Sequence, residues 1–99
     1  MDNDQKKMRE FALKFINSAR GDVAQIEEAL ESENIAAVSD LGHRAKSGAR
    51  MVGAIEFANL CQALENGRSS GDVEQMRRIA NKLRPLLNRI EEQINTNLV

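Results

Sequence analysis

The sequence predicts an all-α protein, an antiparallel four-helix bundle with an additional N-terminal helix packed on it. Apolar residues recur at steps of three and four, and no segment shows the two-residue alternation that is typical of strands. Four glycines fall between the periodic segments, so short turns should join the helices and make neighbouring helices antiparallel. The length of 99 residues suits one core, and we expect residues 1–99 to form a single domain.

The individual elements follow from periodicity and from capping residues. Asp22, Asn34 and Asp72 stand where a helix should begin, and each carries a side-chain oxygen that can accept from the first turn. Pro85 lies off the apolar seam of the last helix and marks a site for a kink. We expect helices over about residues 3–19, 22–32, 34–52, 54–66 and 73–94, with a loop at 67–71.

Composition excludes several classes of function. A net charge of −1 provides no positive field for nucleic acid, and no apolar run approaches the length of a membrane span. The polar start has no signal-peptide character, and the single cysteine, Cys61, suits a reducing compartment, so we expect a cytoplasmic protein. One histidine and one cysteine are too few for a closed zinc site, and we expect neither a metal nor another cofactor.

The third predicted helix contains the only histidine, His43. At about 100° per residue, His43 points roughly opposite the expected buried stripe. This stripe comprises Val38, Leu41, Ala45, Gly48 and Val52. A lone histidine on a helix surface usually has no special role. However, a neutral imidazole is a nucleophile near physiological pH, and one ring nitrogen can keep a proton while the other reacts.

Two residues stand where they could support such chemistry. Lys46 lies one helical turn after His43 and can offset the charge of a phosphoryl group on the imidazole. Glu65 directly follows the apolar positions of the fourth predicted helix, so it should border the groove facing His43. A carboxylate there would accept a hydrogen bond from the ring and orient it.

A partner that reaches His43 must also contact its surroundings. Small side chains leave the ring accessible, and arginines add positive charge, although a plain solvated surface explains the arginines equally well. We expect a docking surface that comprises Gly42, Ser39, Arg44, Ser47 and Arg50.

These residues resemble those of a known family. The chain is similar to the histidine phosphotransfer (HPt) domain of bacterial multistep phosphorelays in His43-Arg44-Ala45-Lys46-Ser47-Gly48, Gly53-Ala54 and Leu60-Cys61-Gln62-Ala63-Leu64-Glu65. It departs from the family pattern where Gly42 and Ala45 replace the usual Ala and Leu, and where Ser47-Gly48 reverses the usual Gly-Ser pair. These small changes should leave the chemistry intact and bear on the choice of partner.

The resemblance implies a four-helix bundle that is phosphorylated on His43, with Lys46 and Glu65 in support. It implies exchange of the phosphoryl group with receiver-domain aspartates, where the receiver supplies the acidic residues and Mg²⁺. The partners would be response-regulator receiver domains, a hybrid sensor kinase, or both. Such a module is a phosphocarrier and not an enzyme on its own. It can stand alone or form a segment of a hybrid sensor histidine kinase.

Two other interpretations remain open at this point. The same bundle could bind or inhibit a receiver or a kinase as an adaptor without carrying phosphate. The apolar seam of the last helix could alternatively join copies of the chain, but a bundle core requires the same seam, and we expect a monomer.

Overall fold

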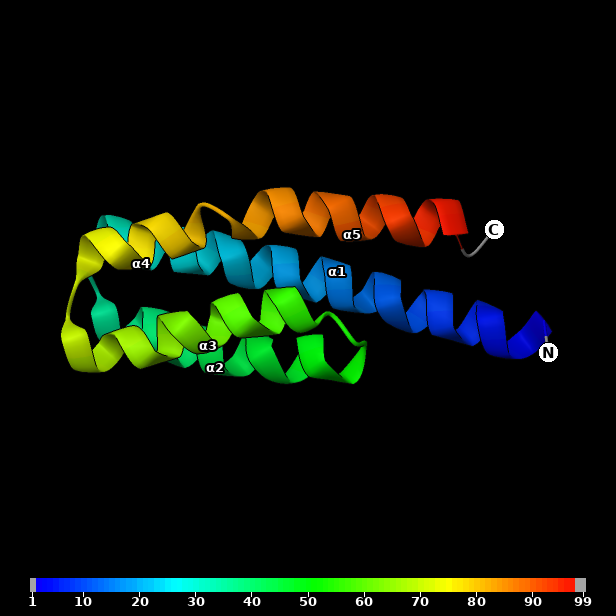
Figure 1. The fold of residues 1–99 in the computed structure, drawn as a ribbon, viewed down its shortest axis with the longest axis horizontal. Helices are drawn as coiled ribbons and strands as arrows, with labels where there is room; N and C mark the ends of the chain where they lie inside the picture. Colours follow the sequence, from blue (N-terminus) through cyan, green and yellow to red (C-terminus); the bar gives the residue numbers. More distant parts are fainter. Residues whose placement is uncertain (1, 98–99) are drawn as a thin grey trace.

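A computed structural model describes the backbone of residues 2–97 and the side chains of residues 4–96. It contains five α-helices, which are α1 (Asp2–Glu31), α2 (Ile35–Met51), α3 (Ile55–Ser70), α4 (Val73–Ala80) and α5 (Leu83–Asn97). No described residue lies in a β-strand, so the all-α prediction is confirmed. The helices lie along the long axis of a molecule that measures 47 × 19 × 18 Å (Figure 1).

The first helix is longer than the sequence suggested. The predicted break near Gly21 is wrong, because α1 continues without interruption to Glu31. The expected additional N-terminal helix is therefore the first half of α1 and not a separate element. A single glycine costs a helix only about 1 kcal/mol. Burial of the residues around it outweighs this cost, because one apolar stripe continues across Gly21 through Ile16, Ala19, Val23 and Ile26.

The predicted last helix is divided in two at Asn81 and Lys82. Pro85 has no N–H, so it cannot donate to the carbonyl group of Asn81 four residues earlier. The chain tightens there instead, and the Lys82 N–H donates to the Ile79 carbonyl oxygen at 3.1 Å. The kink expected from Pro85 thus appears as a break, after which α5 continues in nearly the direction of α4 (Figure 1).

Capping residues and two glycines shape the turns. Asn34 accepts from the Ala37 N–H at 3.2 Å and Asp72 from the Gln75 N–H at 3.0 Å, as predicted. Gly53 and Gly71 have φ values of +78° and +66°, which end α2 and α3 in left-handed turns. The predicted loop at 67–71 is mostly helical, since α3 continues to Ser70.

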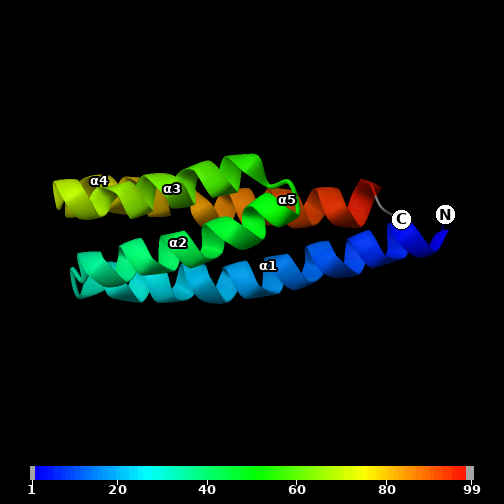
Figure 2. The same ribbon diagram turned by 90° about the horizontal axis from the view of Figure 1, so that it is seen from below.

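The helices enclose one core. α2 packs between α1 and α3, and both α1 and α3 contact α4 and α5 (Figures 1 and 2). Phe15 of α1 and Phe57 of α3 meet edge to face with ring centres 5.7 Å apart, and aliphatic side chains fill most of the remaining core. α1 and α5 extend past the turn between α2 and α3 (Figure 1). Within residues 2–97, none of the helices has both the length and the apolar character that crossing a membrane requires.

Candidate functional site

The site begins with a close approach of two helices. A Cβ atom on Gly42 would lie 2.8 Å from the carbonyl oxygen of Cys61, so α2 and α3 touch where no side chain fits. Beside it, Ser39 is buried, and its hydroxyl donates to the Glu65 carbonyl oxygen at 3.1 Å. The prediction that Gly42 and Ser39 belong to a docking surface is wrong, because α3 covers both residues.

The residues of α2 that are buried lie closer to α3 than the stripe that the sequence predicted. Val38 and Ala45 are buried as expected, but Leu41, Gly48 and Val52 are only half-buried. The buried set of α2 comprises Val38, Ser39, Gly42, Ala45, Lys46 and Ala49. Because α1 and α3 both pack against α2, its buried face is wider than a single stripe.

His43 lies on the exposed side of α2, with 66% of its side chain accessible. Its Nδ1 atom is hydrogen-bonded to Oε1 of Glu65 on α3. Hydrogen bonds from Lys46 and then from His43 lower the pKa of the Glu65 carboxyl group below its ordinary value, so this group is ionised at neutral pH and can only accept. The ring therefore donates from Nδ1, and the neutral imidazole carries its free lone pair on Nε2.

Lys46 lies in the contact between α2 and α3, where only 11% of its side chain is accessible. Its ammonium group donates to Oε2 of Glu65 at 2.8 Å and to Oε1 of Gln62 at 2.9 Å. The expected position of Lys46 was on the open face beside His43. The structure instead places Lys46 beneath that face. There its ammonium group binds the Glu65 carboxylate, which in turn is hydrogen-bonded to the His43 imidazole.

Gln62 is the member of this network that sequence reasoning missed. Its amide nitrogen donates to Oε2 of Glu65 at 3.2 Å and to Oδ1 of Asn66 at 2.9 Å. The signal was available, because Gln62 precedes Glu65 by three residues and so shares its helix face. Nothing in the sequence alone, however, indicates that Lys46 enters the same network from α2.

The geometry is thus an accessible imidazole on a helical scaffold. Nδ1 is hydrogen-bonded, and Nε2 has no hydrogen-bond partner among the side chains of residues 4–96. Comparison with family models gives a match to the Hpt domain over residues 10–95 of the 99. The chain belongs to the Hpt domain family. Hpt domains carry out histidine phosphotransfer in phosphorelays. Searches of curated proteins and of solved structures found no match.

The accessible surroundings of His43 in this Hpt domain are polar. Arg44 donates to Oδ1 of Asp22 on α1 at 2.8 Å, so Asp22 serves an interhelical ion pair and not the predicted helix cap. Ser47 and Arg50 are exposed on the outer side of α2, as expected. One turn before His43, Asp40 pairs with Arg68 of α3 at 3.4 Å.

Cys61 of this Hpt domain is a core residue. It is fully buried, and burial together with the charge of Asp22 raises the pKa of its thiol to about 12, so the thiolate form is suppressed. Across the described residues, no three His, Cys, Asp or Glu side chains gather closely enough to hold a metal ion.

Proposed function

We propose that this Hpt domain carries a phosphoryl group on Nε2 of His43 and exchanges it with aspartates of receiver domains. One observation carries the proposal, namely that Glu65 binds Nδ1 of an accessible imidazole. Nδ1 then keeps its proton and the reactive lone pair stays on Nε2, in a side chain of which 66% is accessible to a partner.

In the accepting step, the Nε2 lone pair attacks the phosphorus of a receiver aspartyl phosphate. A nitrogen–phosphorus bond forms, the bond from phosphorus to the aspartate oxygen breaks, and the aspartate leaves as a carboxylate. The phospho-imidazole retains the Nδ1 proton, which the Glu65 carboxylate stabilises through its hydrogen bond. The donating step is the reverse reaction with the aspartate of another receiver.

Glu65 and Lys46 are positioning residues in this proposal. Glu65 sets the protonation of the ring, and the ammonium group of Lys46 keeps Glu65 ionised and oriented. Because the ammonium group already contacts Glu65 and Gln62, its effect on the phosphoryl group acts mainly through the carboxylate. Gln62 completes the support from the same side.

The docking surface that we propose comprises the accessible neighbours of His43, which are Arg44, Ser47 and Arg50. Arginines suit an acidic, phosphorylated receiver site, because guanidinium groups bind carboxylates and phosphates well. In this proposal the domain works in the cytoplasm as a monomeric antiparallel four-helix bundle, in which α4 and α5 together form the fourth helix. Its partners are receiver domains, alone or within a hybrid sensor kinase.

The test is transfer from a radiolabelled phosphoreceiver. The parent chain should acquire a label that is labile in acid and stable in base, and His43→Gln should acquire none. Arg78→Gln, which alters an exposed residue on α4, is the control and should match the parent. Equal labelling of His43→Gln and the parent would refute the proposal. A parent that binds phosphoreceivers without taking up label would favour the adaptor interpretation.

A further inference from the structure

A phosphoryl group on His43 would add about two negative charges to the surface of α2. Lys46 is poorly placed to balance them, because its ammonium group already donates to Glu65 and Gln62 and only 11% of its side chain is accessible. Residues 21–31 of α1, which lie beside α2, contain neither lysine nor arginine. The balancing cation must therefore be an arginine of α2 or α3.

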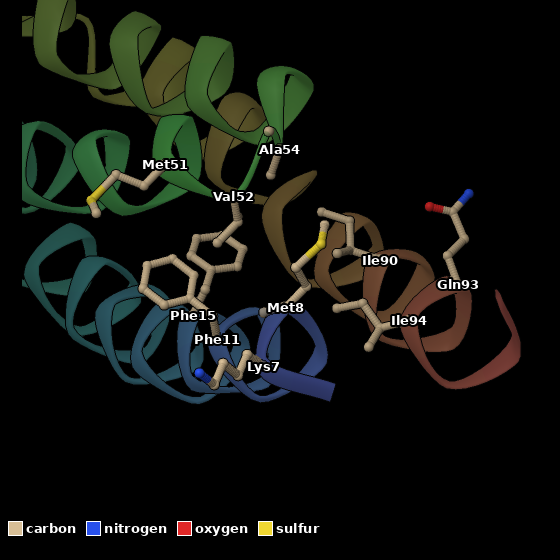
Figure 3. A pocket seen from close by; sticks show the side chains of 12 residues that line it. Lys7, Met8, Phe11, Phe15, Met51, Val52, Ala54, Ile90, Gln93 and Ile94 are labelled. Atoms are coloured by element: carbon tan, nitrogen blue, oxygen red, sulfur yellow. The ribbon is translucent and has the colours of Figure 1, made fainter. Parts of the chain in front are cut away.

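An apolar groove at one end of the molecule lies too far away to contribute. This groove has a volume of about 580 Å³ and lies between α1, α5 and the turn after α2. Figure 3 shows the side chain of Met8 reaching toward Ile90 across it. Among the described residues that line the groove, only Lys7 is charged. Met51 at its edge follows His43 by eight residues, which corresponds to about 12 Å along α2.

The two helices beside the imidazole contain three arginines, which are Arg44, Arg50 and Arg68. Arg50 follows His43 by seven residues, or about 10 Å along the helix. Arg44 is nearer, but its guanidinium group donates to Oδ1 of Asp22 at 2.8 Å, and only 12% of the Asp22 side chain is accessible. Moving Arg44 away would leave a largely buried carboxylate unpaired, which is costly.

Arg68 is both near the imidazole and free to move. Its guanidinium group reaches from α3 to Oδ1 of Asp40 on α2 at 3.4 Å. Asp40 precedes His43 by three residues, so the Cβ atoms of these two residues are about 5–6 Å apart. The ion pair is weak, because the side chains of Arg68 and Asp40 are 59% and 76% accessible and water screens their attraction. Asp40 stays hydrated when Arg68 leaves it.

We propose that Arg68 binds the phosphoryl group of phosphorylated His43, and that its guanidinium group moves there from Asp40. A guanidinium group offers two parallel N–H donors to phosphate oxygens, and its attraction to two negative charges exceeds its attraction to one carboxylate. Asp40 thus keeps Arg68 beside the imidazole until the phosphoryl group arrives. The inference rests on the proposed phosphorylation of His43, but not on the exchange with receivers.

The probe is phosphoramidate, a small phosphoryl donor that loads the histidine of the full chain without a receiver. Nε2 attacks the phosphorus, the phosphorus–nitrogen bond of the donor breaks, and ammonia leaves. In NMR spectra, loading should shift the Nε–H signal of Arg68 and leave that of Arg78, an exposed residue of α4, unchanged. His43→Gln should show neither shift. In Asp40→Asn, the Arg68 signal should differ from that of the parent before loading and coincide with it afterwards.

The rate of loading gives a second measurement. Arg68→Gln should load about fivefold more slowly, because the anionic donor loses a nearby positive charge. Arg68→Lys keeps the charge without the paired donors and should load at an intermediate rate. Arg78→Gln, an equal charge change on α4, should load at the parent rate. Before loading, Arg68→Gln should match the parent in urea unfolding, because the lost ion pair is exposed, so slow loading would not reflect a damaged fold.

The inference is overturned if loading leaves the Arg68 signal in place, or if Arg68→Gln loads at the parent rate. It is also overturned if the signal of Lys46 or Arg44 moves and that of Arg68 does not. Failure of phosphoreceivers to label the chain would instead refute the exchange in the proposed function, because phosphoramidate loads His43 without a receiver.

Discussion

Replacing Gly42 by alanine tests the closest contact in the site. The added Cβ would lie 2.8 Å from the Cys61 carbonyl oxygen, 3.3 Å from the Leu64 Cβ and 3.5 Å from the Glu65 backbone nitrogen. Two of the three neighbours are backbone atoms, which cannot rotate away as a flexible side chain can. The methyl group therefore fits only if α2 and α3 separate.

The size of the effect follows from two opposing contributions. Ordinary contacts begin near 3.4 Å, so the oxygen and the new Cβ are 0.6 Å too close. Overpacking of this kind costs about 1–3 kcal/mol, and the better helix propensity of alanine returns about 1 kcal/mol. We expect Gly42→Ala to lower the free energy of unfolding by about 1 kcal/mol, since the packing cost exceeds the propensity gain.

Gly21→Ala is the matched control. Gly21 also lies inside a helix, but nothing lies within 4 Å of its Cβ position, so only the propensity gain operates. That variant should be more stable than the parent by about 1 kcal/mol. In urea unfolding the two variants should differ by about 2 kcal/mol, which corresponds to roughly 8–16 °C in Tm for a domain of this size.

The outcome that would refute this reasoning is a Gly42→Ala variant that gains as much stability as Gly21→Ala. A second measurement is label uptake on His43. Separation of α2 from α3 would draw Glu65 away from the imidazole, so Gly42→Ala should take up label more slowly and Gly21→Ala at the parent rate.

Three further predictions concern groups next to this contact. Glu65→Gln removes a charge-assisted hydrogen bond to the imidazole. In the neutral ring, a smaller fraction of His43 should then carry the proton on Nδ1, which NMR measures, and label uptake should slow about tenfold. The pKa of Glu65 is lower in the folded chain than in the unfolded chain, so its stabilising contribution is complete above the unfolded pKa and disappears as pH falls through the folded value. Between about pH 5 and pH 3 the parent should therefore lose stability more steeply than Glu65→Gln in urea titrations, and parallel curves would contradict this. Because burial raises the pKa of the Cys61 thiol to about 12, a thiol reagent at pH 8 should modify Cys61 only in the unfolded fraction, and rapid labelling of the native chain would show that the core is open there.

Features that depend on nearby residues could be predicted from the sequence. Asn34 and Asp72 cap helices through contacts three residues ahead, and the exposed position of His43 follows from periodicity within one helix. Pro85 interrupts the last helix because its missing N–H affects a carbonyl group only four residues away. The predicted helix break at Gly21 was wrong for the opposite reason. Burial of the flanking apolar residues against other helices outweighed the low helix propensity of glycine.

By itself, the sequence determined that the chain is helical, and the spacing of His43, Lys46 and Glu65 indicated a resemblance to the Hpt family. Only the tertiary structure decided which side of α2 faces α3. That choice buries Gly42 and Lys46 and brings Gln62 into the network. It also determined that the ends of α1 and α5 leave an apolar groove open. The physical reason is that the periodicity of α2 predicts one buried stripe, whereas α2 packs against two helices, α1 and α3. Where those two helices lie around α2 depends on residues far along the chain.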